Sequence, residues 1–399
     1  MKILVINCGS SSVKFGLFEQ DGKLGEIAAG QLEKIGEASS RLAYRCQTGG
    51  GETQTFAQDV AAEDHRQAFA ALFAAFQSIP ALSGAAPDAI GHRVVHGGEL
   101  FNGPARITQT VIEQIRELNP LAPLHNPVNL LGIEICAQAF PQTPQVAVFD
   151  TAFHQTLPPH AFCYAVPENW YLAHGIRRYG FHGSSHQYLA RAAAEHLGRP
   201  ADTLKLITLH LGNGASAAAI LNGHSIDTSM GFTPLEGLVM GSRSGDLDAM
   251  AALQAAEIFG LEPTRHALMH ESGLLGLCGG NDLREILAAE AAGDDKAQLA
   301  VKLYCYRIRK YVGAYFAVLG GLDALVFSGG VGENSPAIRA QVCAGLSCLG
   351  IDIDLSANHP SRETAIAELQ TAGKTPKILL IRTDEEREIA RQTAQLTQI

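Results

Sequence analysis

The sequence predicts a two-domain α/β protein in which both halves follow one plan, and two observations support this prediction. The 399 residues exceed what one hydrophobic core usually accommodates. The opening segment KILVINCGSSSVKFGLF is typical of a strand, a tight turn and a second strand, and it has a counterpart in LKLITLHLGNGASAAAILNGHSIDT from Leu204 onward. Each half is therefore expected to begin with the same meander of three short strands.

The hairpin turns of the meander are duplicated as well as its strands. Asp21-Gly22 precedes a third apolar run in the first copy, and Asn222-Gly223 joins segment 217–221 to segment 224–228 in the second. Both dipeptides suit type I′ turns, which need a positive φ at both central positions. We expect that turn type in both copies.

The first turn of the meander is small and polar. Its N–H groups and the hydroxyls of Ser10, Ser11 and Ser12 can form an anion-binding concavity, and Lys14 adds a positive charge within reach of a phosphate. On this segment alone, an ordinary buried hairpin with a serine-rich turn fits equally well. The second copy favours phosphate binding, because two such meanders, each followed by helices and strands, resemble the duplicated ASKHA fold of sugar kinases, Hsp70 and actin. That ribonuclease H-like fold implies an ATP cleft between the two domains.

The composition excludes several classes of function. A net charge of −10 without a basic stripe argues against nucleic-acid binding, so a few local Arg and Lys side chains have to hold any anionic substrate. Eight cysteines without a CxxC pair, and a start without an uninterrupted apolar core, predict reduced thiols and no signal peptide. No run approaches the roughly 18 uncharged apolar residues of a membrane span. A cytoplasmic protein without a membrane partner is expected.

Three charged side chains follow predicted strands directly. Arg93 lies at the exit of the strand in DAIGHRVVHGG, Asp150 follows QVAVF, and Glu385 lies near the end of the strand in KILLIRTDEE. Ligands bind beyond the carboxyl ends of strands in open α/β sheets, so these positions are candidates for a site. A surface ion pair is the alternative for Arg93, and structural capping is the alternative for Asp150.

The helix predicted in YGFHGSSHQYLARAAAEHLGRP places His182 next to its N-terminus. Ser184 is the expected N-cap, and Gln187 completes a capping box. The helix dipole, the free N–H groups and an imidazole together suit a transferring phosphoryl group. His182 and His186 also have i, i+4 spacing, but no carboxylate motif accompanies them, so a zinc site is not predicted.

Further loops are expected to face a ligand. GSRSGDLDAM places Arg243 in a bend of small residues, before a helix that Asp246 or Asp248 caps. LCGGNDLREIL begins a helix near Asp282. DALVFSGGVGENSP is typical of a buried strand and a Gly-rich turn, followed by a helix with Ser335 as its N-cap.

Two glycine motifs do not indicate other nucleotide-binding folds. Gly373-Lys374-Thr375 resembles the end of a P-loop, but it lacks the glycine five residues earlier and precedes Pro376, so it is not a Walker A motif. GNGASA fits a dinucleotide-binding turn, yet the Asn222-Gly223 turn follows too soon for a Rossmann helix.

Eight segments, in order and over nearly the whole chain, resemble the acetate kinase family: NCGSSSVK, GHRVVHGG, APLHNP, FDTAFH, YGFHGSSH, HLGNG, GSRSGDLD and GGVGENS. The resemblance implies reversible transfer of the ATP γ-phosphoryl group to acetate, giving acetyl phosphate and ADP, with Mg²⁺ or Mn²⁺, in a homodimer. It also implies a substrate and phosphate domain at residues 1–150 plus 387–399, and a nucleotide-binding domain at residues 151–386.

The resemblance also implies roles for single residues. The catalytic positions fall on Asp150 as acid or base, on His182 and Arg243 as transition-state stabilisers, and on Arg93, which binds the substrate. The methyl pocket falls on Val95, Leu124, Phe181 and Pro234, and the metal positions fall on Asn7 and Glu385. The nucleotide positions are Ser10, Ser12, Lys14, His210, Leu211, Gly212, Asn213, Gly214, Asp282, Leu283, Arg284, Gly330, Val331, Gly332, Glu333 and Asn334.

Asp150 need not transfer a proton, because the substrate carboxylate is already ionised at neutral pH. We predict instead that Asp150 orients Arg93 or a metal-bound water. The sequence departs from the family pattern in GSRSGDLDA, CGGND and TDEE, none of which removes a charged catalytic position.

Two alternatives to an acetate kinase function remain open from the sequence. A propionate or butyrate kinase differs only in pocket volume, where each methylene is worth about 1 to 3 kcal/mol. A non-catalytic nucleotide switch of the actin or Hsp70 kind needs an exposed partner-binding surface or an extra peptide-binding domain, and we expect no residues to be left over for one.

Overall fold

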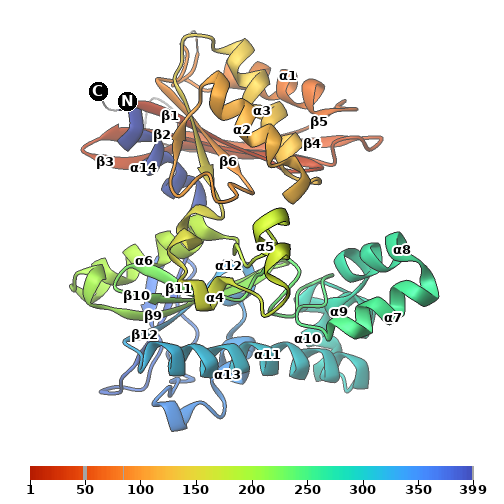
Figure 1. The fold of residues 1–399 in the computed structure, drawn as a ribbon. Helices are drawn as coiled ribbons and strands as arrows, with labels where there is room; N and C mark the ends of the chain where they lie inside the picture. The colour runs from red at the N-terminus through yellow and green to blue at the C-terminus, as the bar shows by residue number, and fades with distance from the viewer. Residues whose placement is uncertain (48–51, 84, 398–399) are drawn as a thin grey trace. The chain divides into compact units, whose positions relative to one another are not determined.

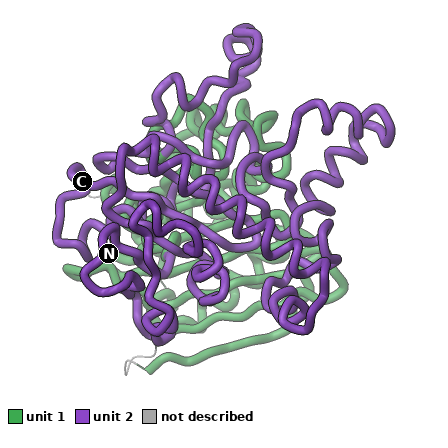
Figure 2. Tube along the Cα trace, turned by 90° about the horizontal axis from the view of Figure 1, so that it is seen from below, with its two compact units in different colours: residues 1–153, 384–399 green, residues 154–383 purple. Residues whose placement is uncertain are grey.

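The computed structural model describes residues 1–47, 52–83 and 85–397. The chain divides into two compact units. Unit 1 consists of residues 1–153 and 384–399, and unit 2 of residues 154–383 (Figure 2). Glu385 thus belongs to unit 1, whereas the sequence analysis placed residues up to 386 in the second domain. Within the described ranges, no helix is long and apolar enough to cross a membrane.

Unit 1 contains a mixed sheet with the strand order β5-β4-β3-β2-β1-β6-β8-β7. Strands β1, β6 and β8 run parallel, and β1 to β5 pair in antiparallel order. The strands are β1 Lys2–Cys8, β2 Ser12–Asp21, β3 Lys23–Glu33, β4 Ser40–Gln47, β5 Thr53–Val60, β6 Ala89–Val94, β7 Ala105–Arg106 and β8 Gln145–Phe149. The helices are α1 His65–Phe76, α2 Gln109–Glu117, α3 Asn126–Ala139 and α14 Glu385–Thr397.

Alternation along β1 separates the two faces of this sheet. Leu4 and Ile6 pack into a core with α1 and α3, whereas Ile3 and Val5 pack into a second core with α14. Figure 1 shows α14 on the opposite side of the sheet from α1 and α3. Because side chains alternate with a period of two, Asn7 shares the α14 face with Ile3 and Val5.

Unit 2 contains a sheet with the order β11-β10-β9-β12-β14-β13, in which β9, β12 and β14 run parallel. Helix α6 packs against β9, β12 and β14, and the long helix α11 packs against β9 and β10 (Figure 1). The strands are β9 Lys205–Leu211, β10 Ala215–Leu221, β11 His224–Thr228, β12 Ala324–Ser328, β13 Ile366–Glu368 and β14 Lys377–Ile381. The helices are α4 Pro159–Phe162, α5 Glu168–His174, α6 Gly183–Leu197, α7 Ala249–Phe259, α8 Leu261–His266, α9 Gly273–Cys278, α10 Leu283–Ala291, α11 Asp295–Leu319, α12 Gly329–Asn334 and α13 Pro336–Cys343.

The two sheets share one core order, which confirms the predicted duplication. The order β3-β2-β1-β6-β8 in unit 1 corresponds to β11-β10-β9-β12-β14 in unit 2, with antiparallel and parallel neighbours at matching places. The carboxyl ends of the three parallel strands meet at one edge of each sheet. Ligands are therefore expected at that edge in both units.

Several local predictions are confirmed and three are wrong. Ser335 caps α13 with Pro336 in its first turn, Asp248 caps α7, and Asn222 and Gly223 both have positive φ. The type I′ turn predicted at Asp21-Gly22 is wrong, because only Gly22 has a positive φ. Asp21 already pairs with Lys23, which leaves a single residue at the tip of this hairpin.

The other two corrections concern helix starts. Ser184 is not the N-cap of α6; His182 is, with a φ of 58°, and the helix begins two residues earlier than predicted. The capping box with Gln187 depends on that N-cap and is part of the same correction. The Gly-rich turn predicted after β12 is itself the short helix α12, because the positive φ of Gly329 (77°) lets the chain turn directly after the extended Ser328.

The contact of Gly91 with α14 generates a stability prediction. A Cβ at Gly91 in β6 would lie 2.3 Å from Thr393 Oγ1 and 2.9 Å from Ile389 Cγ2. Gly91→Ala should therefore push α14 off the sheet and destabilise unit 1 by about 1 to 3 kcal/mol. A lower thermal unfolding midpoint than that of Gly103→Ala, whose added Cβ meets nothing within 4 Å, would support this. Equal midpoints would contradict it.

Candidate active site

Arg93 and Asp150 form a bidentate ion pair at the edge of the unit 1 sheet. Arg93 Nε donates to Asp150 Oδ1 at 2.9 Å, and Arg93 Nη2 donates to Oδ2 at 2.6 Å. Asp150 is 1% exposed, while the Arg93 side chain keeps 21% of its surface accessible. The surface alternative for Arg93 is therefore wrong: its partner is buried, and its remaining N–H groups are accessible to an anion.

The strand register explains why this pair forms. Arg93 lies opposite Val148 across the parallel β6 and β8, and Asp150 follows β8 by one residue. Val148 belongs to the core beneath α14, so period-two alternation places Asp150 on that same face. Asp150 N–H donates to Val94 O at 2.9 Å and extends the ladder to the site.

Asn7 and Lys14 lie beside this ion pair. They are directly opposite each other on β1 and β2, so their side chains share a face. Arg93 Nη1 reaches Asn7 Oδ1 at 3.4 Å. Helix α14 begins on this face with Glu385 and Glu386, and a Cβ at the neighbouring Gly16 would approach Glu386 Cβ to 3.4 Å.

The carboxylates of this face influence one another. Burial alone lowers the pKa of Arg93, but the charges of Asp150, Glu385 and Glu386 outweigh burial and raise it above the ordinary value. Burial raises the pKa of Glu385; Arg93 and Lys14 counteract part of this rise, and Asp150 adds to it. Burial and the charge of Glu385 likewise raise the pKa of Glu386.

These groups fit a hard divalent cation. Mg²⁺ prefers oxygen ligands and is commonly held by one or two carboxylates together with substrate phosphates. Asn7 and Glu385 offer an amide oxygen and a carboxylate, and the burial that raises the pKa of Glu385 disfavours its charged form, which a bound cation would stabilise. The described residues contain no cluster of three or more His, Cys, Asp or Glu side chains with the geometry of a fully protein-ligated metal.

The other predicted residues of unit 1 lie on loops. Gly9 N–H donates to Ser12 O at 2.8 Å and closes the serine turn, in which Ser10 is exposed. Val95 N–H donates to Asn129 Oδ1 at 3.0 Å directly after β6. Leu124 is 55% exposed, so its side chain is accessible to a ligand.

In unit 2, Gly214 brings His182 and Arg243 together. A Cβ at Gly214 would lie 3.5 Å from His182 Nε2 and 3.8 Å from Arg243 Nη1, so both side chains flank this glycine. The ring of His182 also lies 4.4 Å from that of His210, between centroids. The structure thus gathers His182, His210, Gly214 and Arg243 from three separate segments.

Arg243 is held by uncharged groups. Its Nη1 donates to Pro234 O at 3.2 Å and lies 3.8 Å from Met240 Sδ. In unit 2, over its described residues, no carboxylate pairs with it, and burial lowers the pKa of Arg243. Asp246 was one of the two residues expected to cap α7. Its carboxylate instead accepts hydrogen bonds from Gly237 N–H and from the Tyr311 hydroxyl. A half-buried arginine without a counter-ion in its own unit favours an anionic ligand.

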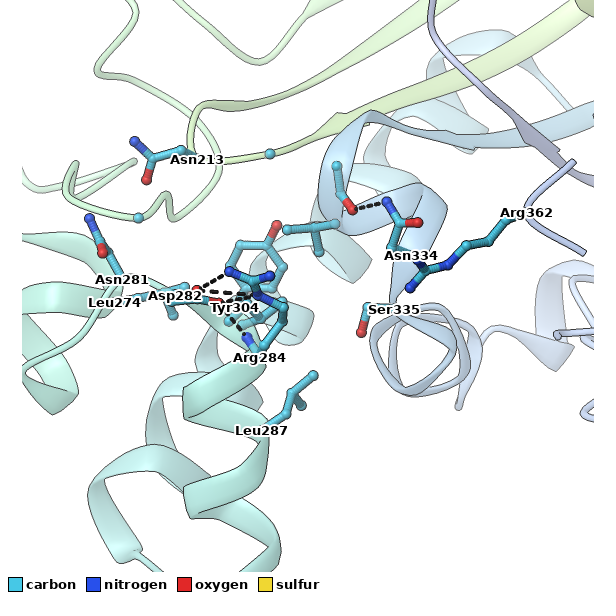
Figure 3. A pocket seen from close by; sticks show the side chains of 15 residues that line it. Asn213, Leu274, Asn281, Asp282, Arg284, Leu287, Tyr304, Asn334, Ser335 and Arg362 are labelled. Carbon is cyan, nitrogen blue, oxygen red and sulfur yellow. Dashed lines mark hydrogen bonds and ion pairs between the residues drawn. The ribbon is translucent and has the colours of Figure 1, made fainter. Parts of the chain in front are cut away.

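A pocket of about 660 Å³ opens beside these residues in unit 2, a volume suited to a nucleotide. Figure 3 shows Asp282, Arg284 and Leu287 on one side of it and Asn334, Ser335 and Arg362 on the other. The predicted residues that line it are Gly212, Asn213, Asp282, Leu283, Arg284, Gly330, Val331 and Asn334.

Other predicted nucleotide residues lie outside this lining. The carboxylate of Glu333 is bound by other protein groups: it accepts hydrogen bonds from Gly329 N–H at 3.1 Å and from Thr383 N–H at 2.9 Å, and it forms an ion pair with Arg382. Gly332 is buried within α12. His210 and Leu211 end β9, where Ser185 Oγ lies 2.8 Å from His210 Nδ1.

Sequence reasoning missed several residues of this pocket. They are Gly241, Leu274, Asn281, Leu287, Tyr304, Ser335 and Arg362. The buried Tyr304 hydroxyl has no hydrogen-bond partner among the described residues, so it can bind a ligand. Asn281 adjoins the predicted Asp282, which was a usable signal, whereas nothing in the local sequence distinguishes Arg362.

Three features define a phosphotransferase of the two-domain ASKHA class. They are two duplicated sheets, a partly accessible arginine paired with a buried carboxylate, and a nucleotide-sized pocket near a half-buried arginine that no carboxylate of unit 2 pairs with.

Comparisons with known proteins place the chain within this class. The model of the acetokinase family matches residues 2–391. The chain is 49% identical to an acetate kinase of Syntrophobacter fumaroxidans, over 99% of this chain and 97% of that protein. The crystal structure of the Porphyromonas gingivalis acetate kinase matches with a TM-score of 0.89 at 42% identity, and that of a propionate kinase from Francisella tularensis with a TM-score of 0.91 at 39% identity; each match covers 99% of both chains. The chain belongs to the acetokinase family.

A buried histidine next to the site generates a pH prediction. His154 Nε2 contacts Phe181 O at 3.1 Å, and burial lowers the pKa of His154 to about 4. The unfolded chain, with a histidine pKa near 6.5, binds this proton first as the pH falls. This contribution to stability is fully present above about pH 6.5 and is lost between there and pH 4.

Replacing His154 should weaken that dependence. His154→Gln keeps a donor and an acceptor but cannot be charged, so its unfolding midpoint should fall less than that of the wild type between pH 7 and pH 4.5. Parallel curves of midpoint against pH for the two proteins would contradict the prediction.

Proposed function

We propose that this chain catalyses reversible, Mg²⁺-dependent transfer of the ATP γ-phosphoryl group to acetate, giving acetyl phosphate and ADP. The Arg93–Asp150 pair carries the proposal: it leaves accessible guanidinium N–H groups backed by a buried carboxylate, an arrangement suited to binding a small carboxylate substrate. The acetate kinases among its relatives support the choice of substrate.

The residues of unit 1 hold the acceptor. Arg93 binds the acetate carboxylate, and Asp150 keeps its guanidinium fixed through both bonds. Val95 and Leu124 contribute apolar surface toward the acetate methyl group. Asn7 and Glu385 would hold Mg²⁺, which when bound neutralises charge on the ATP phosphates. Lys14 and the turn with Ser10 and Ser12 bind phosphate oxygens.

The residues of unit 2 hold the nucleotide and stabilise the transferring group. The pocket beside Asp282 and Asn334 takes the nucleoside part of ATP. His182 and Arg243 donate hydrogen bonds to the equatorial oxygens of a planar, metaphosphate-like phosphoryl group. Positioning and charge stabilisation account for most of the catalysis in such transfers.

Propionate is the second candidate acceptor, because a propionate kinase matches this fold at 39% identity. Rates with ATP plus acetate, propionate or butyrate, with the acyl phosphate trapped by hydroxylamine, test the proposal. We expect the highest kcat/KM with acetate. A higher kcat/KM with propionate would identify propionate as the preferred acceptor instead of acetate. If none of the three carboxylates gives an acyl phosphate, the proposed function is wrong.

Asp150→Asn should lower kcat strongly at every pH, because the neutral amide cannot hold both guanidinium nitrogens of Arg93. The acidic limb of the kcat–pH profile should stay where it is, since Asp150 transfers no proton in this scheme. If the wild-type limb disappears in the variant, Asp150 is a general base instead. Arg93→Lys, which keeps the charge but not the paired geometry, should show a similar loss.

Arg243→Ala should lower kcat about 100- to 1,000-fold with a much smaller change in the KM of ATP and acetate, because it removes a donor used in the transition state. Steady-state kinetics check this against Arg199→Ala, which removes a partly exposed arginine paired with Asp323. A rise in KM alone would make Arg243 a substrate-binding residue.

We also propose that the protein is a homodimer that buries the apolar surface of α7 and α8. Helix α7 has no buried residue, and Met250, Ile258, Phe259 and Leu261 are each more than 60% exposed. Such a patch is typical of an interaction surface. Light scattering should give about twice the 42.4 kDa chain mass for the wild type and for Leu355→Asp, and the monomer mass for Phe259→Asp. A monomeric wild type would contradict this.

A further inference from the structure

Three buried polar side chains behind His182 are not used by the roles assigned above. His182 Nδ1 lies 2.9 Å from Ser216 Oγ, and His186 Nε2 lies 2.8 Å from the same oxygen. His186 Nδ1 in turn lies 2.7 Å from Thr208 Oγ1. Ser216, His186 and Thr208 are all 0% exposed. Because water cannot reach them, each polar hydrogen of these side chains needs an acceptor among the neighbouring side chains.

The register of the sheet explains why these hydrogen-bonded side chains lie together. Ser216 on β10 lies opposite His210 on β9, and Thr208 lies two residues before His210, so Ser216 and Thr208 share one face. That face meets α6, which supplies His186 one turn after its N-cap, His182. The four side chains therefore meet only because β9, β10 and α6 pack together.

The hydrogen-bond direction follows from Thr208. Among the described residues, His186 is the one side-chain partner of the Thr208 hydroxyl. A hydroxyl that only accepted this bond would leave its own buried hydrogen unpaired, so Thr208 donates to His186 Nδ1. His186 is neutral, because burial and the neighbouring His154 and His210 lower its pKa well below the ordinary value.

The remaining bonds then have one consistent arrangement. With Nδ1 accepting, the single proton of neutral His186 is on Nε2 and is donated to Ser216 Oγ. The hydroxyl hydrogen of Ser216 is left to be donated to His182 Nδ1. Nδ1 of a neutral His182 is therefore an acceptor, and its proton is on Nε2, the ring nitrogen that a Cβ at Gly214 would approach to 3.5 Å.

We propose that Thr208, His186 and Ser216 are positioning residues that hold His182 in the tautomer with its proton on Nε2. The inference rests on the proposed function, in which His182 contacts the transferring phosphoryl group. A protonated Nε2 donates to a phosphoryl oxygen, whereas an unprotonated Nε2 directs a lone pair at it and repels it. The buried chain thus keeps a neutral imidazole ready as a donor.

Two substitutions at Thr208 separate this role from a packing role. Thr208→Val keeps the shape and removes the donor, whereas Thr208→Ser keeps the donor and removes a methyl group. We expect kcat to fall about 10- to 100-fold in Thr208→Val, with KM values within about twofold, and to stay near the wild-type value in Thr208→Ser. A merely structural role predicts the larger defect in Thr208→Ser. That result, or an unchanged kcat in Thr208→Val, would overturn the proposal.

Neutron diffraction from crystals of the deuterated protein gives a readout that does not depend on activity. At about pH 8, where an ordinary imidazole is neutral, deuterium should be on Nε2 of His182 and not on Nδ1. Deuterium on Nδ1 alone would overturn the tautomer assignment even in an active enzyme. Absence of acyl phosphate formation, with deuterium on Nε2, would instead refute the proposed function and leave the hydrogen-bond direction intact.

Discussion

Parallel pairing of three central strands in each unit determines where this protein can carry out chemistry. In unit 1, β1, β6 and β8 end at one edge with Asn7, Arg93 and Asp150. In unit 2, β9 and β12 end beside each other with His210 and the start of α12. A parallel ladder leaves its carboxyl ends together, and there the chain turns into loops whose backbone and side-chain polar groups are free to bind a ligand.

The duplicated scaffold carries different chemistry at matching places. Asn7 on β1 corresponds to His210 on β9, and their partners on the next strand are Lys14 and Ser216. Unit 1 thus surrounds its edge with fixed charges, including the carboxylates at the start of α14. Unit 2 surrounds its edge with histidines and hydroxyls, and its half-buried Arg243 donates to the Pro234 carbonyl oxygen and has no carboxylate partner within the unit.

This difference agrees with what phosphoryl transfer requires. In the proposed reaction, the acceptor and the metal need charges that stay in place, and the Arg93–Asp150 pair would supply them because each group fixes the other. The transferring phosphoryl group needs hydrogen-bond donors that are not already paired with a carboxylate. Arg243, held by the Pro234 carbonyl, and His182, held by the Ser216 hydroxyl, both meet this need, because neither partner neutralises the donor.

The sequence by itself determined the duplicated plan, the helix start at Ser335 and Pro336, and the family, because strand patterns, turn residues and motifs are local. It also identified Arg93 and Asp150 as strand-end residues. Their pairing came only from the register of β6 and β8. The helix starts at His182 rather than at the better N-cap residue Ser184, and the turn after Asp21 has a positive φ at Gly22 alone. In both places the observed backbone differs from what the residue types prefer locally. The chain from Thr208 through His186 to Ser216, and the place of Arg362 in the pocket, join residues far apart in sequence. Such contacts depend on how strands and helices pack, so only the tertiary structure could decide them.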